Sequence, residues 1–180
     1  MLLHSSTTAN LLVASLTSAL LESILDEWTW LIGMEKRPLL VTACGDVFVE
    51  DLQEGTIHFL DVSKPELSLV SANRQLFETL LDEPAFVATC FHPDRVETLR
   101  AKGSILKKDQ IYGFTTPLSL GGQISLDNMG ITDVEVHFSI CGQIERQLAD
   151  VPTGARINGI EIEKVPRKKY GGGFGSSVAR

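Results

Sequence analysis

The chain has few cysteines, no CxxC pair and no long hydrophobic run. Cys44, Cys90 and Cys141 are far apart and odd in number, which argues against a disulfide framework or a zinc site and favours a reducing, cytoplasmic setting. No apolar run approaches the length of about 20 residues that spans a bilayer, so we expect no membrane partner. Glycine-rich phosphate-binding motifs are also absent, and nothing in the sequence indicates a cofactor.

Lysine and arginine are scarce outside the C-terminal end. The formal net charge is −7, and residues 164–180 contribute +5 with no acid among them, so the rest of the chain carries −12. An acidic body of this kind disfavours nucleic-acid binding and favours a basic protein partner.

At 180 residues and 43% hydrophobic composition, the chain fits one domain with a substantial core. We expect a helical leader over residues 1–27, a single α+β domain over residues 28–163 and a flexible, basic, glycine-rich tail over residues 164–180. Apolar residues at helical spacing predict an amphipathic helix over about residues 10–28. Trp28 and Trp30 then anchor this helix to the core or offer a contact to a partner.

Residues 39–70 predict a β-meander of short strands joined by tight turns. Val47 and Val49 alternate with Phe48 and Glu50, which is the pattern of a half-buried strand. Short helices are predicted over residues 73–81, 84–91 and 93–102. Strands are predicted over residues 110–114 and 133–140. The fold class is therefore α+β, with a mostly antiparallel sheet and helices packed on it.

The meander contains several acids and no basic residue between Cys44 and Val62. If these acids share one exposed face, that face can attract a basic partner. The alternative is a solubilising surface that protects edge strands. The residues in question are Asp46, Glu50, Asp51, Glu54 and Asp61.

Glu135, His137 and Ser139 form a polar row on the predicted strand 133–140. Alternate side chains of a strand are roughly 7 Å apart, too far for a nucleophile to reach its base, so this row is not a catalytic triad by itself. His137 could instead bind a metal with His58 and Asp46 or Glu50, although no spacing demands it. No basic residue adjoins the cysteines, which favours buried thiols over nucleophiles. We expect neither catalytic residues nor a metal site.

Several segments, taken in order, resemble the C-terminal domain of the type VI secretion DNase-immunity (Tdi-type) family and the wider SUKH superfamily of immunity proteins. These are WTWLIG (28–33), LLVTA (39–43), GDVFVED (45–51), QIYGF (110–114) and DVEVHFSICGQI (133–144). The resemblance implies a SUKH-like α+β fold and a non-enzymatic role: binding a cognate toxin in the cytoplasm.

Three functional hypotheses follow. The preferred one is an immunity protein that neutralises a nuclease-type toxin by offering its basic cleft an acidic surface. The alternatives are a regulatory or scaffold module with an unrelated partner, and a small metal-dependent hydrolase. The oligomeric state stays open. The predicted partner-binding residues are Asp46, Glu50, Asp51, Glu54 and Asp61, with Glu135 and His137 as secondary candidates.

Overall fold

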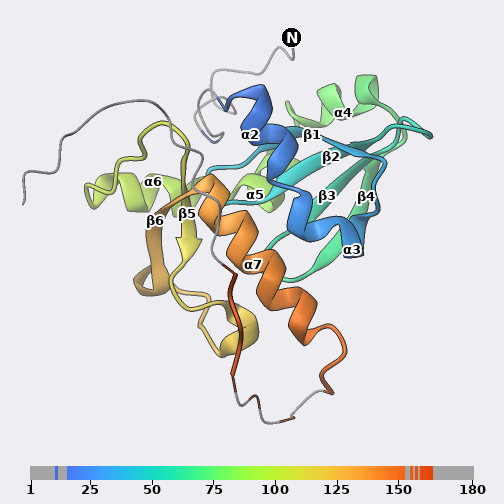
Figure 1. Ribbon diagram of the computed structural model, residues 1–180. Coiled ribbons are helices and arrows are strands. Elements are labelled where there is room, and N and C mark those ends of the chain that lie inside the picture. The colour runs from blue at the N-terminus through green and yellow to red at the C-terminus, as the bar shows by residue number, and fades with distance from the viewer. Residues whose placement is uncertain (1–10, 12–15, 153–154, 156, 158, 164–180) are drawn as a thin grey trace, which may run out of the picture.

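The computed structural model describes residue 11 and residues 16–152, 155, 157 and 159–163. The predictions for the first ten residues of the leader and for the tail at 164–180 lie outside these residues. Helices cover both faces of an antiparallel sheet, and a smaller two-stranded sheet stands beside it (Figure 1). The α+β class predicted from the sequence is confirmed. Among the described residues, no helix combines the length and the apolar character needed to cross a membrane.

The main sheet is a four-stranded antiparallel meander in the order β1-β2-β3-β4. Its strands are β1 (Lys36–Val41), β2 (Val47–Asp51), β3 (Ile57–Asp61) and β4 (Glu66–Ser71). The last three confirm the predicted meander. The sequence analysis missed β1, an edge strand that contains Pro38. Proline is tolerated at a sheet edge because its missing N–H can face away from the ladder.

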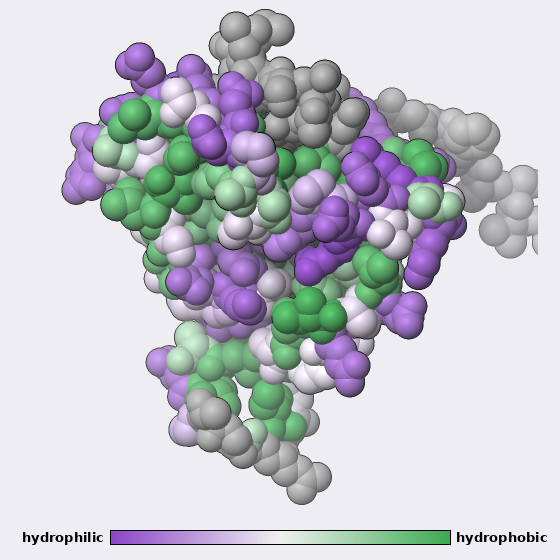
Figure 2. Space-filling model, turned by 180° about the vertical axis from the view of Figure 1, so that it is seen from behind, coloured by the Kyte–Doolittle hydropathy of each residue, from purple (hydrophilic) through white to green (hydrophobic). Residues whose placement is uncertain are grey.

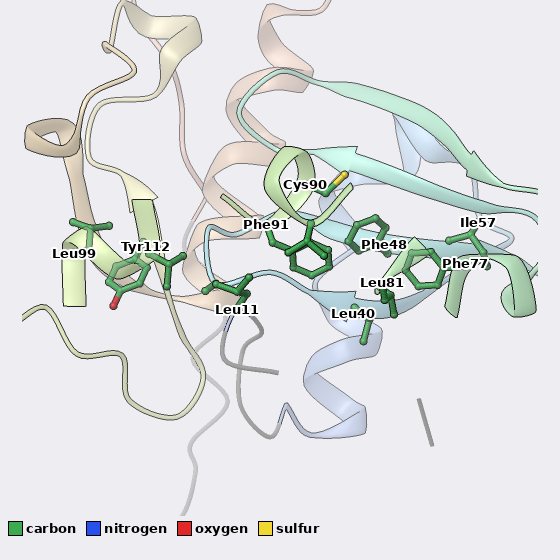
Figure 3. Close-up of a cluster of buried hydrophobic side chains, with 13 residues drawn as sticks. Leu11, Leu40, Phe48, Ile57, Phe77, Leu81, Cys90, Phe91, Leu99 and Tyr112 are labelled. Atoms are coloured by element: carbon green, nitrogen blue, oxygen red, sulfur yellow. The ribbon is translucent and has the colours of Figure 1, made fainter. Parts of the chain in front are cut away.

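Helices α4 (Arg74–Leu80) and α5 (Pro84–Phe91) cover one face of the meander, and α6 (Pro93–Ala101) extends the same core toward Tyr112. All three were predicted. Proline is the first residue of α5 and of α6, where its fixed φ suits the helix and no N–H is needed. The ring of Phe48 lies at the centre of this core and contacts other phenylalanine rings at centroid distances of 4.8–5.9 Å (Figure 3).

The opposite face is covered by α2 (Ser18–Ser23), the short 3-10 helix η1 (Asp26–Trp28), α3 (Thr29–Ile32) and α7 (Val134–Leu148). The prediction of one continuous helix over about residues 10–28 is therefore wrong: in the described part of this range, α2 ends at Ser23 and the separate helix η1 begins at Asp26. Apolar residues of the predicted leader share one core with the meander; they are Leu20, Ile24 and Leu25.

Strand β2 is buried on both faces, not on one as its sequence pattern indicates. Val47 and Val49 face the core beneath α2 and α7, and Phe48 faces the core beneath α4 and α5. Trp28 is fully buried, and its indole N–H donates to the backbone oxygen of Phe138 at 3.0 Å. This supports the core-anchor interpretation of Trp28.

The second sheet pairs β5 (Gln110–Phe114) with β6 (Met129–Asp133). The loop between them contains the 3-10 helices η2 (Leu118–Leu120) and η3 (Leu126–Asn128). The hairpin is tied to the main sheet because the backbone N–H of Tyr112 donates to the backbone oxygen of Ala43 at 2.8 Å. The predicted strand at 110–114 is confirmed.

The predicted strand at 133–140 is wrong, because Asp133 ends β6 and the next residue begins α7. Val134, Phe138 and Gly142 are buried at helical spacing. Gly142 lies so close to η1 that an added Cβ would be 2.8 Å from the backbone oxygen of Glu27. The alternating apolar residues favour a strand locally, but packing against η1 and the meander selects the helix.

Candidate functional site

Asp46 is buried and cannot contact a partner as the structure stands. Its carboxylate accepts a hydrogen bond from the backbone N–H of Val62 at 3.0 Å. Burial, together with the nearby carboxylate of Asp61, raises the pKa of Asp46 to about 8. The side chain is therefore mainly protonated at neutral pH, and its role is to hold the turn before β2 against the end of β3.

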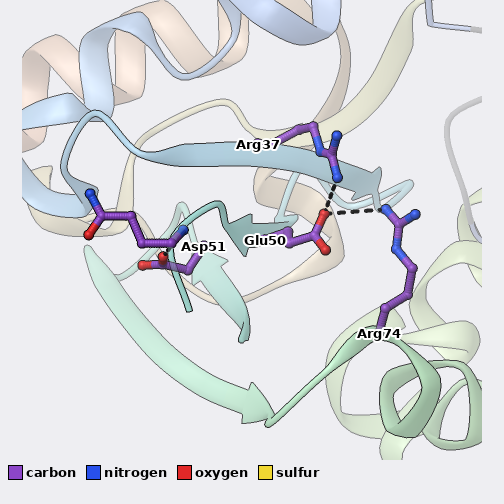
Figure 4. A network of polar contacts seen from close by, with 5 residues as sticks. Arg37, Glu50, Asp51 and Arg74 are labelled. Carbon is purple, nitrogen blue, oxygen red and sulfur yellow. Dashed lines mark hydrogen bonds and ion pairs between the residues drawn. The ribbon is translucent and has the colours of Figure 1, made fainter. Parts of the chain in front are cut away.

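Glu50 and Asp51 are held in ion pairs with bases of the same molecule (Figure 4). The register of β1 and β2 places Arg37 opposite Glu50 and Lys36 opposite Asp51. Arg74, at the start of α4, also approaches Glu50 at 3.5 Å. The Lys36 ammonium lies 2.6 Å from Asp51 and lowers the pKa of that carboxyl, with help from backbone N–H groups of the following turn.

The last two meander acids lie in turns. Glu54 is exposed in the turn between β2 and β3. Asp61 accepts hydrogen bonds from the backbone N–H groups of Ser63 and Lys64 at 2.9 and 3.1 Å, and so closes the turn before β4. Carboxylates that accept backbone N–H groups in this way stabilise turns.

The meander acids therefore do not gather on one exposed face, and that part of the prediction is wrong. The five carboxylates are divided among a buried site, two ion-paired positions and two turns. Lysine and arginine are missing inside the acidic stretch, but β1 and α4 supply them from outside it. Whether any of these acids contacts a partner stays a prediction.

A second stretch without basic residues forms an exposed acidic turn. No lysine or arginine occurs between Arg74 and Arg95. Glu78 lies on α4, and Asp82 and Glu83 lie between α4 and α5; all three are exposed. Within the described part of the chain none of them forms an ion pair. We call Glu78, Asp82 and Glu83 the acidic turn; the sequence analysis missed it, although the same gap in basic residues could have revealed it.

The acidic turn belongs to the side of the molecule that α4, α5 and α6 cover. Figure 2 shows that on this side hydrophilic residues stand in several groups separated by apolar ones. The acidic turn contributes three exposed acids to this side of the molecule.

Glu135 and His137 lie on α7 and not on a strand. Side chains that are two positions apart on a helix point in directions about 200° apart, so Glu135 and His137 do not share a face. The polar row of three is therefore divided: Glu135 and Ser139, four residues apart, lie on one side of α7, and His137 lies on another. Among the described residues, no three His, Cys, Asp or Glu side chains lie close enough to hold a metal ion. His58, His137 and the meander acids therefore do not converge on one site.

A pocket of about 330 Å³ opens between the β5–β6 hairpin and α7. Its walls are the end of β5 with the following loop, β6, and one face of α7. None of its lining residues is Asp, Glu, Lys or Arg. They are Gly113, Phe114, Thr115, Pro117, Gly130, Ile131, Thr132, Val136, His137, Ile140, Cys141 and Ile144.

The orientation of His137 is fixed by its contact with Gly45. Its Nε2 atom lies 3.1 Å from the backbone oxygen of Gly45. A Cβ at Gly45 would lie 2.5 Å from Nε2, and the φ of Gly45 is +87°, so both the contact and the backbone require glycine. Burial lowers the pKa of His137 to about 4, and the hydrogen bond to Gly45 opposes this. The imidazole is therefore neutral at pH 7.

Cys141 lies one helical turn after His137, and its Sγ is 3.7 Å from Nδ1. Burial, together with the nearby carboxylates of Glu145 and Asp46, raises the pKa of the Cys141 thiol to about 12. A neutral thiol beside a neutral imidazole is the opposite of the thiolate–imidazolium pair that cysteine nucleophiles use. Cys141 therefore lacks the ionised thiol of a cysteine nucleophile, in agreement with the sequence interpretation of the cysteines.

Comparison with known protein families finds one relationship at the level of sequence. The sequence model of the family described as T6SS immunity protein Tdi1, C-terminal, matches residues 71–145. This confirms the predicted resemblance to the Tdi-type family. The matched range contains two of the five segments on which the resemblance was based, at 110–114 and 133–144. The other three precede it.

Comparison with solved structures finds a crystal structure of Atu4351 from Agrobacterium tumefaciens. The two proteins are 18% identical, with a TM-score of 0.44, and the match covers 68% of this chain. The chain spans 64% of the length of that protein, which is less than two thirds. No curated protein matches the chain.

The family match begins where the meander ends. Residues 71–145 comprise α4, α5, α6, the β5–β6 hairpin and most of α7. The acidic turn and all the residues that line the pocket fall inside this range. The five meander acids fall outside it.

Proposed function

We propose that the chain is an immunity protein that binds and neutralises a secreted toxin and catalyses no reaction itself. The observation that carries this proposal is the match of residues 71–145 to the immunity family. The positions of Glu135 and His137 on α7 support a binding role. Their side chains point about 200° apart, whereas the hydrolase alternative needs both of them at one site with a meander acid.

The proposed toxin is a nuclease with a basic cleft, and the neutralisation takes place in the cytoplasm. A formal charge of −12 outside the tail supports a basic partner, because opposite charges accelerate association and help to exclude wrong partners. All three cysteines are free, which supports a reducing compartment.

The proposed contact surface is the acidic turn and not the middle of the meander. Glu78, Asp82 and Glu83 are exposed and can approach a basic cleft without first leaving a partner. Glu50 and Asp51 would have to break ion pairs to do so. The acidic turn also lies inside the range that matches the family.

The immunity hypothesis predicts a toxin gene adjacent to the gene for this chain, and the test uses that toxin. Co-expression of the chain should restore growth to cells that produce the active toxin. The purified chain should bind a catalytically inactive form of the toxin. Failure to protect and to bind would contradict the immunity role and favour a regulatory or scaffold module with an unrelated partner.

The contact surface is tested with two double variants of equal charge. Asp82→Lys/Glu83→Lys should weaken toxin binding at least tenfold, or by about 1.4 kcal/mol, at low salt. The matched control is Glu54→Lys/Glu66→Lys, which changes the net charge equally at two exposed meander positions. Its affinity should stay within about twofold of the parent. A larger loss of affinity in the control variant would indicate that the toxin contacts the meander.

A further inference from the structure

The pocket between the β5–β6 hairpin and α7 has a polar group directed into an uncharged space. A volume of about 330 Å³ is within the range of small-molecule sites in proteins. Charged residues make up 22% of the chain, yet none lines this pocket. Its walls therefore offer no ionic partner to a phosphate, a carboxylate or an ammonium group, and desolvating any of these here would be costly.

The tautomer of His137 follows from its surroundings. The backbone oxygen of Gly45 can only accept a hydrogen bond, so Nε2 of His137 must donate and carry the proton. In the neutral imidazole the other nitrogen, Nδ1, is then an acceptor. It lies between two pocket-lining residues: 3.7 Å from Sγ of Cys141, and 3.0 Å from where a Cβ of Gly113 would stand.

The contact from Cys141 leaves Nδ1 available to a stronger donor. A thiol is a weak hydrogen-bond donor, and 3.7 Å is a long contact even for sulfur. A hydroxyl or N–H group entering the pocket could replace it. The remainder of the lining is mostly aliphatic or aromatic, with hydroxyls only at Thr115 and Thr132.

We propose that this pocket binds a small uncharged molecule that has an apolar body and one hydrogen-bond donor, with the donor directed to Nδ1 of His137. Phenols and alcohols of about seven to ten non-hydrogen atoms have this chemistry. Such a ligand would contact both strands of the hairpin and α7 at once. This binding activity is separate from toxin neutralisation and does not depend on it.

The proposal is tested by titrating the ¹⁵N-labelled full chain with phenol. Saturable amide shifts should appear at Gly113, Gly130 and Thr132, with a dissociation constant of the order of 1 mM for a ligand of this size. Anisole, which has the same ring but no donor, should bind about fivefold more weakly, which corresponds to one hydrogen bond. Benzoate should cause no saturable shift at these amides.

A second measurement reads His137 directly. The ¹⁵N spectrum of its ring should show the Nε2–H tautomer in the free chain, and the Nδ1 resonance should move when phenol binds. The proposal is overturned if the proton is on Nδ1 or if the Nδ1 resonance does not move when phenol is added. It is also overturned if phenol and anisole bind with equal affinity, or if benzoate causes amide shifts equal to those of phenol.

Two tryptophan variants locate the binding. Thr115→Trp places a bulky ring at an exposed position in the wall of the pocket and should abolish the phenol shifts. Thr116→Trp makes the same change one residue further along, at an exposed position outside the lining, and should leave them intact. Phenol shifts that persist in Thr115→Trp would show that the ligand binds elsewhere and would overturn the proposal.

Discussion

The fold treats the acids of two lysine- and arginine-free stretches in opposite ways. Between Cys44 and Val62 the acids lie in a meander, where strand pairing brings bases to them from β1 and buries Asp46. Between Arg74 and Arg95 the acids lie at a junction of two helices, and those of the acidic turn stay exposed without ion pairs in the described structure. A stretch of sequence without lysine or arginine therefore predicts unpaired acids only where no neighbouring strand brings basic side chains to them.

The largest effect is expected from reversing a charge in the meander. Glu50→Lys would place a third positive group beside Arg37 and Arg74 at a position whose side chain is only 14% exposed. We expect the free energy of unfolding to fall by roughly 3 kcal/mol, because two cations lose their shared partner in a partly buried setting. Urea unfolding at pH 7 measures this.

The matched change in the acidic turn is Glu78→Lys. Its side chain is exposed and has no ion pair to lose in the described structure, so the loss should stay below about 0.5 kcal/mol. Equal losses in the two variants would contradict the distinction between paired and free acids.

The second effect concerns the buried carboxyl of Asp46. The native state keeps its proton up to about pH 8, whereas the unfolded chain loses it near pH 4. Because the native state binds more protons in this window, stability should fall as the pH rises from about 4 to about 8. Asp46→Asn cannot ionise and can still accept from the N–H of Val62, so it should be more stable than the parent at pH 8, by roughly 2 kcal/mol.

Urea unfolding at pH 5 and pH 8 tests this prediction, and Glu54→Gln is the control. Glu54 is exposed, so its neutral variant controls for the removal of one acidic side chain from the surface. A parent and an Asp46→Asn variant with parallel stability curves would show that the carboxyl ionises normally in the native state.

The third effect has the opposite sign and concerns His137 on α7. The pKa of His137 is near 4 in the native state and about 6.5 when unfolded. The unfolded chain therefore binds more protons between these values, and stability should be lost as the pH falls from about 6.5 to about 4.

His137→Gln removes this titration but keeps an N–H that can donate to Gly45. We expect the loss of stability across that acid range to be smaller than in the parent by about 1 kcal/mol. Comparing thermal unfolding at pH 4.5 and pH 7 measures it. If His137→Gln loses as much stability in acid as the parent does, the acid sensitivity of the parent arises from other titratable groups.

The sequence was sufficient to predict the meander and the three helices that follow it, because turn residues and proline mark their ends clearly. Pro84 and Pro93 each open a helix, and the alternation in β2 and β3 is strong. The sequence was not sufficient to predict β1, because Pro38 argues against a strand unless that strand lies at the edge of a sheet. That omission caused the error about the acidic face, because Lys36 and Arg37 of β1 hold Glu50 and Asp51.

The assignment of α7 failed for a different reason. Val134, Val136, Phe138 and Ile140 satisfy the period of a strand. The helical period emerges only further along the chain, where Ile144 and Leu148 follow Ile140 at intervals of four residues. Gly142 matters because of its close approach to Glu27, a contact between residues more than a hundred positions apart. The pocket was equally inaccessible to sequence analysis, because it needs the hairpin and α7 to be placed against each other.

The smallest effect on stability should accompany a clear effect on binding. Asp82 and Glu83 precede α5, where negative charge interacts favourably with the helix dipole, so their charge has a structural explanation as well as a functional one. Asp82→Asn/Glu83→Gln should lower the free energy of unfolding by only about 0.5 kcal/mol. If the acidic turn contacts a basic toxin, the same variant should weaken binding more than this, and the difference should shrink as salt is raised. If the loss of binding free energy is no greater than the loss of stability and does not depend on salt, these acids stabilise α5 only and the toxin binds elsewhere.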